Sequence, residues 1–274
     1  MRVKSFAVKL TKALSFAVIF MSGVANAETL RIGGTGVALG SISLVGAAFE
    51  ARNPDVSVEV LPSLGSSGGI KALVAGAIDL SVSSRALKPA EAEKGAQAER
   101  YATTPLAIVT SSKTNAEAVT TEQLAQMYSG ELAHWPSGQL VRVVLRPASE
   151  TDTRILSSLS GAVSQAIKAA QERPGLISAM NDQENAETLE NLEGSLGAVA
   201  LGQIATEKRQ LKVLRLNGVL PKPGDPSAQA GVFRRDLYIV KTQATSGTAA
   251  RFYDFLFSDE AASILAAHDH TPVN

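Results

Sequence analysis

The stretch Gly65-Ser66-Ser67-Gly68-Gly69-Ile70 joins two apolar patterns of different period. Before it, residues 56–60 (VSVEV) alternate apolar and polar side chains, which is typical of a half-buried strand. After it, residues 70–77 (IKALVAGA) place apolar side chains at helical spacing. The glycines therefore lie where a strand ends and a helix begins, which predicts an α/β unit.

A turn of this kind has the chemistry of an anion site. The first N–H groups of a helix have no partner within the helix, and the helix dipole adds partial positive charge at the same end. Glycine carries no Cβ atom, so a ligand can approach the backbone closely. The alternative is a tight turn without a ligand, because short glycine-rich motifs often match by chance.

Two further predicted strands end in glycine or hydroxyl residues. Residues 29–32 (TLRI) run into residues 33–36 (GGTG), and residues 78–82 (IDLSV) run into residues 83–85 (SSR). In open α/β sheets, ligands bind at the carboxyl ends of the strands. We therefore expect the three turns to form one ligand site.

A fourth loop adds a fixed positive charge. The predicted strand 141–145 (VRVVL) ends at Arg146, whose planar guanidinium suits the oxygen atoms of an oxyanion. Ser149 is placed to cap the helix that follows. The alternative for Arg146 is a structural ion pair with Glu150 or Asp152.

The first 27 residues have the pattern of a cleaved export signal. A basic start, MRVK, precedes a short apolar run and the small residues of Ala25-Asn26-Ala27. A membrane anchor is the weaker alternative, because the uncharged run of residues 13–27 is shorter than the roughly 20 residues of a spanning helix. We predict cleavage after Ala27 and a soluble chain in the periplasm or outside the cell.

The composition narrows the function classes further. The chain has no cysteine, which excludes disulfides, thiol catalysis, thiolate metal sites and a lipid-modified N-terminal cysteine. Without the four basic residues of the export signal, the 26 basic and 26 acidic residues become 22 and 26, a formal charge of −4. A nucleic-acid binder is expected to carry a basic excess, so that class is disfavoured. Many small aliphatic residues and few aromatic ones favour an α/β core.

The loops together resemble those of a known family, the periplasmic phosphate-binding proteins of bacterial ATP-driven importers, within the type II substrate-binding superfamily. The resemblance covers essentially the whole chain after residue 27. Residues 33–37 (GGTGV) are similar to the family's first GSTTV loop, residues 65–70 to its GSGTGI turn, and residues 79–85 (DLSVSSR) to its DIGxSSR loop. Residues 124–135 are similar to its Leu…Ile-Phe-x-Gly…Trp signature, and Arg146 with residues 149–151 (SET) to its Arg…Ser-Gly-Thr anion loop.

The resemblance implies the two-lobe periplasmic-binding-protein type II fold. This is an α/β fold in which two crossing strands join the lobes and the ligand cleft lies between them. The crossing strands would be residues 106–110 and 237–241. The first lobe would be discontinuous, with residues 28–107 and 236–274, and the second would hold residues 108–235.

The resemblance also implies a ligand and its contacts. The expected contacts are the side chains of Thr35, Ser66, Ser84, Arg146, Ser149 and Thr151, and the backbone N–H groups of Gly36 and Glu150. Hydroxyl and N–H donors together with one guanidinium can hold an oxyanion. We expect a monomeric binding protein with no catalysis, cofactor or metal, which captures inorganic phosphate or a similar tetrahedral oxyanion for a membrane ABC permease.

Three positions depart from the family pattern. Ser84 stands where many members have an aspartate that accepts the proton of phosphate, so unprotonated sulfate meets less repulsion here. Glu150 replaces a glycine, and its carboxylate either points away from the ligand or takes over the role of proton acceptor. The spacing from Arg146 to Ser149 is one residue shorter than in the commonest motif. The open alternatives are a binder of sulfate, arsenate or tungstate, and a periplasmic oxyanion sensor.

A serine hydrolase is the alternative from another class. Residues 65–69 match Gly-x-Ser-x-Gly in the strand-turn-helix context of a nucleophile elbow, with Ser67 as the nucleophile. The later histidines are His134, His268 and His270. The last two belong to a polar tail that we expect to be solvated, which is a poor setting for a catalytic base or a metal.

Three local predictions concern the surrounding elements. Residues 89–100 are polar and rich in alanine, which predicts a surface helix. Ser41 is placed to cap a helix that ends at Asn53-Pro54. Residues 248–257 and 259–267 predict two amphipathic helices near the end of the chain.

Overall fold

The computed structural model of the protein describes residues 27–224 and 233–273. The predicted export signal lies outside these ranges, apart from Ala27. Among the helices within them, none combines the length and the apolar character that crossing a bilayer requires.

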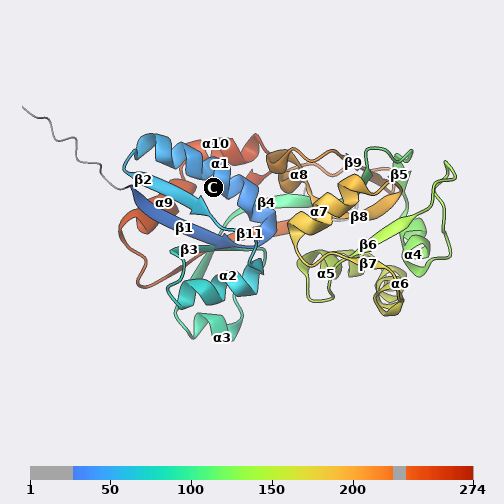
Figure 1. Ribbon diagram of the computed structural model, residues 1–274, viewed down its shortest axis with the longest axis horizontal. Coiled ribbons are helices and arrows are strands. Elements are labelled where there is room, and N and C mark those ends of the chain that lie inside the picture. The colour runs from blue at the N-terminus through green and yellow to red at the C-terminus, as the bar shows by residue number, and fades with distance from the viewer. Residues whose placement is uncertain (1–26, 225–232, 274) are drawn as a thin grey trace, which may run out of the picture.

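One sheet of ten described strands runs through the molecule (Figure 1). Its strands are β1 (Glu28–Gly34), β2 (Val56–Val60), β3 (Leu80–Ser83), β4 (Ala96–Ser111), β6 (Arg142–Leu145), β7 (Ile177–Ser178), β8 (Ser195–Ala200), β9 (Leu211–Val213), β11 (Phe233–Thr242) and β12 (Thr271–Pro272). They follow the order β2-β1-β3-β11-β4-β8-β6-β7, and β9 and β12 pair with β4. A separate sheet pairs β5 (Ala118–Val119) with β10 (Arg215–Leu216).

The helices surround this sheet. They are α1 (Gly36–Arg52), α2 (Gly65–Val74), α3 (Pro89–Ala92), α4 (Thr121–Ser129), α5 (Thr151–Ser157), α6 (Gly161–Glu172), α7 (Asp182–Asn191), α8 (Leu201–Glu207), α9 (Gly247–Leu256) and α10 (Asp259–Ala266). Figure 1 shows α1, α2, α9 and α10 with β1 to β3 in one half of the molecule, and α4 to α7 with β6 to β8 in the other.

Each half has its own hydrophobic core. In the first, Ile42 and Phe49 of α1 pack with residues of α9, and the rings of Phe49 and Phe252 meet edge to face at 5.3 Å. In the second, the buried Trp135 packs with Leu196 and the apolar face of α6. These two cores and the long strands between them confirm the α/β fold of two lobes. The lobe boundaries at residues 107/108 and 235/236 stay a prediction.

The strands that join the halves are longer than the sequence predicts. β4 and β11 pair antiparallel from Thr242 opposite Ala96 to Phe233 opposite Leu106. The prediction of a helix over residues 89–100 is wrong, because only α3 is helical and Gly95, at φ +89°, ends that turn. Long-range pairing with β11 outweighs the helix propensity of this alanine-rich segment.

The start of α1 also differs from the prediction. The helix begins at Gly36, so Ser41 lies within it and donates to the carbonyl oxygen of Ala38 at 2.9 Å. The cap prediction for Ser41 is therefore wrong. The two helices predicted near the end of the chain are confirmed as α9 and α10.

The histidine tail is not solvated as expected. β12 pairs with β4, and His270, just before β12, is 2% exposed. Its Nδ1 lies 2.6 Å from the carbonyl oxygen of His268, and its ring packs against Gly202. Burial lowers the pKa of His270 to about 4, which favours the neutral ring.

Candidate functional site

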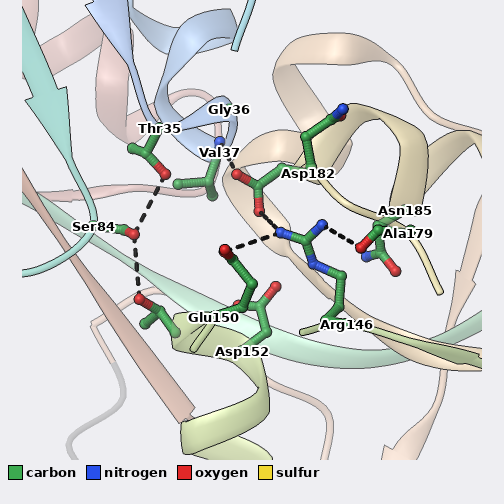
Figure 2. Close-up of polar contacts among 12 residues, drawn as sticks. Thr35, Gly36, Val37, Ser84, Arg146, Glu150, Asp152, Ala179, Asp182 and Asn185 are labelled. Carbon is green, nitrogen blue, oxygen red and sulfur yellow. Dashed lines mark hydrogen bonds and ion pairs between the residues drawn. The ribbon is translucent and has the colours of Figure 1, made fainter. Parts of the chain in front are cut away.

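Four hydroxyl side chains from four separate segments meet at Ser84. Its Oγ lies 3.3 Å from Thr35 Oγ1 (Figure 2). The same atom lies 3.4 Å from Ser66 Oγ and 3.4 Å from Thr151 Oγ1. Thr35 and Ser84 are buried, whereas Ser66 and Thr151 are partly exposed. We call these four residues the hydroxyl cluster. The structure thus brings together four of the residues that the sequence predicts as ligand contacts.

Backbone pairing places two members of the hydroxyl cluster. β1 and β3 are parallel neighbours with Gly34 opposite Val82, and the N–H of Thr35 donates to the carbonyl oxygen of Val82 at 2.9 Å. Gly34 has φ +143°, and a Cβ atom there would lie 2.8 Å from the Val82 nitrogen, so only glycine fits. The N–H of Ser84 donates to Ser66 Oγ at 3.1 Å.

Three helices begin at the hydroxyl cluster. Thr35 precedes α1, Ser66 lies in the first turn of α2, and Thr151 is the first residue of α5. α2 starts at Gly65 with φ +66°, in the left-handed region that favours glycine. The first-turn N–H groups of all three helices therefore add partial positive charge beside the hydroxyls.

Arg146 lies close to Glu150 and is held by three acceptors. Its side chain is 6% exposed, and Nη1 donates to the carbonyl oxygen of Ala179 at 2.9 Å. Nη2 lies 3.2 Å from Glu150 Oε2 and 3.3 Å from Asp182 Oδ1 (Figure 2). The ion pair with Glu150 that was the alternative for Arg146 is present, whereas Asp152 pairs with Arg235 at 2.7 Å.

Asp182 is a central residue that the sequence does not single out. It is the first residue of α7, and its Oδ2 accepts a hydrogen bond from the N–H of Val37 in α1 at 3.0 Å. Its Oδ1 lies 3.3 Å from both Arg146 Nη2 and Arg235 Nη1. In the sequence, Asp182 looks like an ordinary acidic residue in the first turn of a helix. The helix dipole favours such residues there, so the sequence gives no reason to assign Asp182 to a functional site.

We call Arg146, Asp152, Asp182 and Arg235 the buried charge cluster. Burial raises the pKa of Asp152 to about 6, although Arg235 opposes this shift. Burial would also raise the pKa of Asp182, but Arg235 and Arg146 outweigh it and hold that pKa below its usual value. Asp182 is therefore ionised at neutral pH and is a counter-charge that both guanidinium groups share.

Glu150 directs its carboxylate toward Arg146 (Figure 2). The side chain therefore turns toward Arg146, and its role as an acceptor for the proton of phosphate stays a prediction. Its backbone N–H, which the resemblance implies as a ligand contact, donates to the carbonyl oxygen of Pro147 at 3.0 Å. Gly36, whose N–H the resemblance also implies, is buried and begins α1 directly after Thr35 of the hydroxyl cluster.

Ser149 is not part of the hydroxyl cluster. Its side chain is exposed and, within the described chain, forms no hydrogen bond with the hydroxyl cluster. The prediction that it caps α5 is wrong, since Glu150 occupies the N-cap position. Contact of each predicted residue with a ligand stays a prediction.

The surroundings of Ser67 do not resemble a hydrolase site. Its exposed hydroxyl accepts a hydrogen bond from Arg85 Nη2 at 2.9 Å, and Arg85 pairs with Glu91 at 2.6 Å. In the described part of the chain, no histidine bonds to Ser67, and His268 and His270 face backbone carbonyl oxygens. Within residues 27–224 and 233–273, no group of three or more His, Cys, Asp or Glu is placed to hold a metal ion.

Comparison with known proteins identifies a family for this chain. Residues 22–260 match the PBP superfamily domain. The chain is 25% identical over 208 residues to the phosphate-binding protein PstS of Borreliella burgdorferi, covering 73% of this chain and 75% of that protein. It is 32% identical over 88 residues to PstS 2 of Streptococcus agalactiae serotype V, covering 32% of this chain and 30% of that protein.

Solved structures share the fold. A Clostridium perfringens protein with bound phosphate superposes with a TM-score of 0.74 at 20% identity, covering 90% of this chain and 100% of that one. An ABC-type phosphate transport receptor from Vibrio cholerae superposes with a TM-score of 0.59 at 20% identity, covering 89% and 99%. By its sequence match, the chain belongs to the PBP superfamily.

Proposed function

We propose that the protein captures inorganic phosphate, or a similar tetrahedral oxyanion, in the periplasm and delivers it to a membrane ABC importer. It acts as a monomer and without catalysis in this proposal. The observation that carries it is the meeting of four hydroxyls from both lobes with the N-termini of three helices. The names of the PstS relatives support phosphate as the ligand.

The spacing of the hydroxyl cluster favours a ligand with several oxygen atoms. The other three hydroxyl oxygens lie 3.3–3.4 Å from Ser84 Oγ, whereas O–H···O hydrogen bonds are usually about 2.7–2.8 Å long. The hydrogen bonds among these hydroxyls are therefore weak, and each O–H group can instead donate a shorter hydrogen bond to an oxyanion. Hydrogen bonds to a charged acceptor are about twice as strong as neutral ones.

Glu150 supplies discrimination between oxyanions in this proposal. The site otherwise offers hydroxyl, N–H and guanidinium donors, and this carboxylate is an acceptor beside Arg146. Phosphate that carries a proton can donate it to a carboxylate, whereas sulfate has no proton at neutral pH and is repelled. Glu150 thus takes the role that the resemblance assigns to an aspartate at the position of Ser84.

A thermal-shift panel of phosphate, arsenate, sulfate and tungstate tests the proposal. Phosphate at 100 times its dissociation constant should stabilise the protein by about 2.7 kcal/mol. Ser84→Ala should lose most of this shift. Ser43→Ala is the matched control, because Ser43 is exposed on α1 and bonds only to the carbonyl oxygen of Leu39.

The panel separates two ways of being wrong. Stabilisation by sulfate or tungstate without any by phosphate would contradict the choice of ligand and leave the oxyanion site in place. No shift with any of the four anions would contradict the proposed function.

A further inference from the structure

The first turn of α2 has little in its own sequence to hold it in place. Three of its first five residues are the glycines Gly65, Gly68 and Gly69, and glycine is among the poorest helix formers. The N-cap residue, Leu64, provides no side-chain hydrogen bond. This turn nevertheless carries Ser66, a member of the hydroxyl cluster. Contacts from outside α2 must therefore fix the turn.

Two consecutive residues after β3 supply such contacts. The N–H of Ser84 donates to Ser66 Oγ at 3.1 Å. The next residue, Arg85, donates from Nη2 to Ser67 Oγ at 2.9 Å. The loop after β3 therefore holds the first turn of α2 at two neighbouring side chains.

Arg85 is itself held in one orientation. Its guanidinium forms a double ion pair with Glu91, in which Nη1 lies 2.8 Å from Oε2 and Nη2 lies 2.6 Å from Oε1. Nη1 also donates to the carbonyl oxygen of Ala86 at 2.9 Å. With the bond to Ser67, four of the five N–H donors of this guanidinium are engaged.

The pair of Arg85 and Glu91 is largely shielded from water. The two side chains are only 15% and 16% exposed. The hydrogen bonds from Arg85 lower the pKa of Glu91, so the carboxylate is ionised at neutral pH. Charged hydrogen bonds in this double geometry are strong and directional, so the pair forms a firm support for Ser67.

We propose that Arg85 is a positioning residue of the oxyanion site, and that it acts through Ser67 on the first turn of α2. The inference rests on the proposed function. With Ser67 held, the turn keeps Ser66 Oγ at 3.4 Å from Ser84 Oγ and keeps its N–H groups directed at the ligand. Ser67 is then an acceptor for Arg85, and the Gly-x-Ser-x-Gly motif places a helix end.

Titration calorimetry with inorganic phosphate tests the inference. Arg85→Gln should weaken phosphate binding by about three- to tenfold, the size expected for the loss of one hydrogen bond. Arg85→Lys keeps the positive charge beside Glu91 and loses the planar fork, so its affinity should lie between those of wild type and Arg85→Gln. Arg52→Gln is the matched control, because Arg52 also pairs with a glutamate, Glu260, but at the last residue of α1. Its affinity should stay within twofold of wild type.

Ser67→Ala separates positioning from a general loss of stability. It removes the acceptor and leaves the pair of Arg85 and Glu91 in place, and it should weaken phosphate binding by a similar factor. The melting temperature of the ligand-free variant should not fall, since Ser67 is exposed and alanine favours a helix. The double variant with Arg85→Gln and Ser67→Ala should bind within twofold of Arg85→Gln alone, because both changes break the same contact.

The inference and the proposed function can fail separately. Phosphate binding by Arg85→Gln and Ser67→Ala within twofold of wild type would overturn the inference alone. Losses that multiply in the double variant would also overturn it, since Arg85 would then act independently of Ser67. A wild-type protein that binds none of phosphate, arsenate, sulfate and tungstate would refute the proposed function and this inference with it.

Discussion

Replacing Asp182 by asparagine removes the shared counter-charge of two buried arginines. The carboxylate is 7% exposed and lies 3.3 Å from Arg146 Nη2 and from Arg235 Nη1. An asparagine can still accept the hydrogen bond from Val37, but it cannot balance either charge. Removal of one partner of a buried ion pair costs about 3–5 kcal/mol, and we expect about 3 kcal/mol because Glu150 and Asp152 remain.

Urea unfolding at pH 7, compared with wild type, measures this change. For a chain of this size, a loss of about 3 kcal/mol corresponds to a melting temperature lower by roughly 6–12 °C. Glu187→Gln is the matched control, since Glu187 is exposed on the same helix and should change stability by less than about 0.5 kcal/mol. A loss below about 1 kcal/mol in Asp182→Asn would show that the buried charge cluster does not depend on this carboxylate.

Three further predictions address the site and its surroundings. Glu150→Gln should lower the ratio of phosphate to sulfate affinity by about tenfold in calorimetry, because the acceptor for the phosphate proton is lost; an unchanged ratio would exclude that role. His270→Gln should remove an acid-sensitive contribution to stability. Burial lowers the pKa of His270 from 6.5 to about 4. Between these pH values the imidazole is protonated in the unfolded chain and neutral in the folded protein. As the pH falls from about 6.5 to about 4, the free energy of unfolding of wild type should therefore drop by up to roughly 3 kcal/mol more than that of the variant, measured by urea unfolding. Equal pH dependence of the two free energies would contradict this. Gly36→Ala should destabilise the protein by about 1–3 kcal/mol, since the new Cβ would lie 2.9 Å from the side chain of Asp182. Gly161→Ala, at a helical position with open space, should have little effect in the same denaturation experiment and serves as the control.

The sequence predicts the hydroxyl cluster because its members lie at places where local patterns change. Thr35, Ser66 and Ser84 each follow a predicted strand, and Thr151 lies in the first turn of a predicted helix. Parallel strands bring their carboxyl ends to one edge of a sheet, so the meeting of these residues follows from topology. The resemblance to a family then adds Thr151 as a contact and the ligand class.

The sequence does not predict the buried charge cluster, because its contacts depend on how distant helices dock. Asp182 and Val37 lie 145 positions apart, and no local pattern relates them. The same limit applies to the start of β4, where the alanine-rich segment favours a helix locally and pairs with β11 in the fold.

A crystal structure of the mature protein grown with phosphate tests the central claim most directly. We expect one phosphate within hydrogen-bond distance of Thr35, Ser66, Ser84 and Thr151, with the lobes closed around it. Phosphate density away from these four hydroxyls, with the hydroxyl cluster unchanged, would contradict the account.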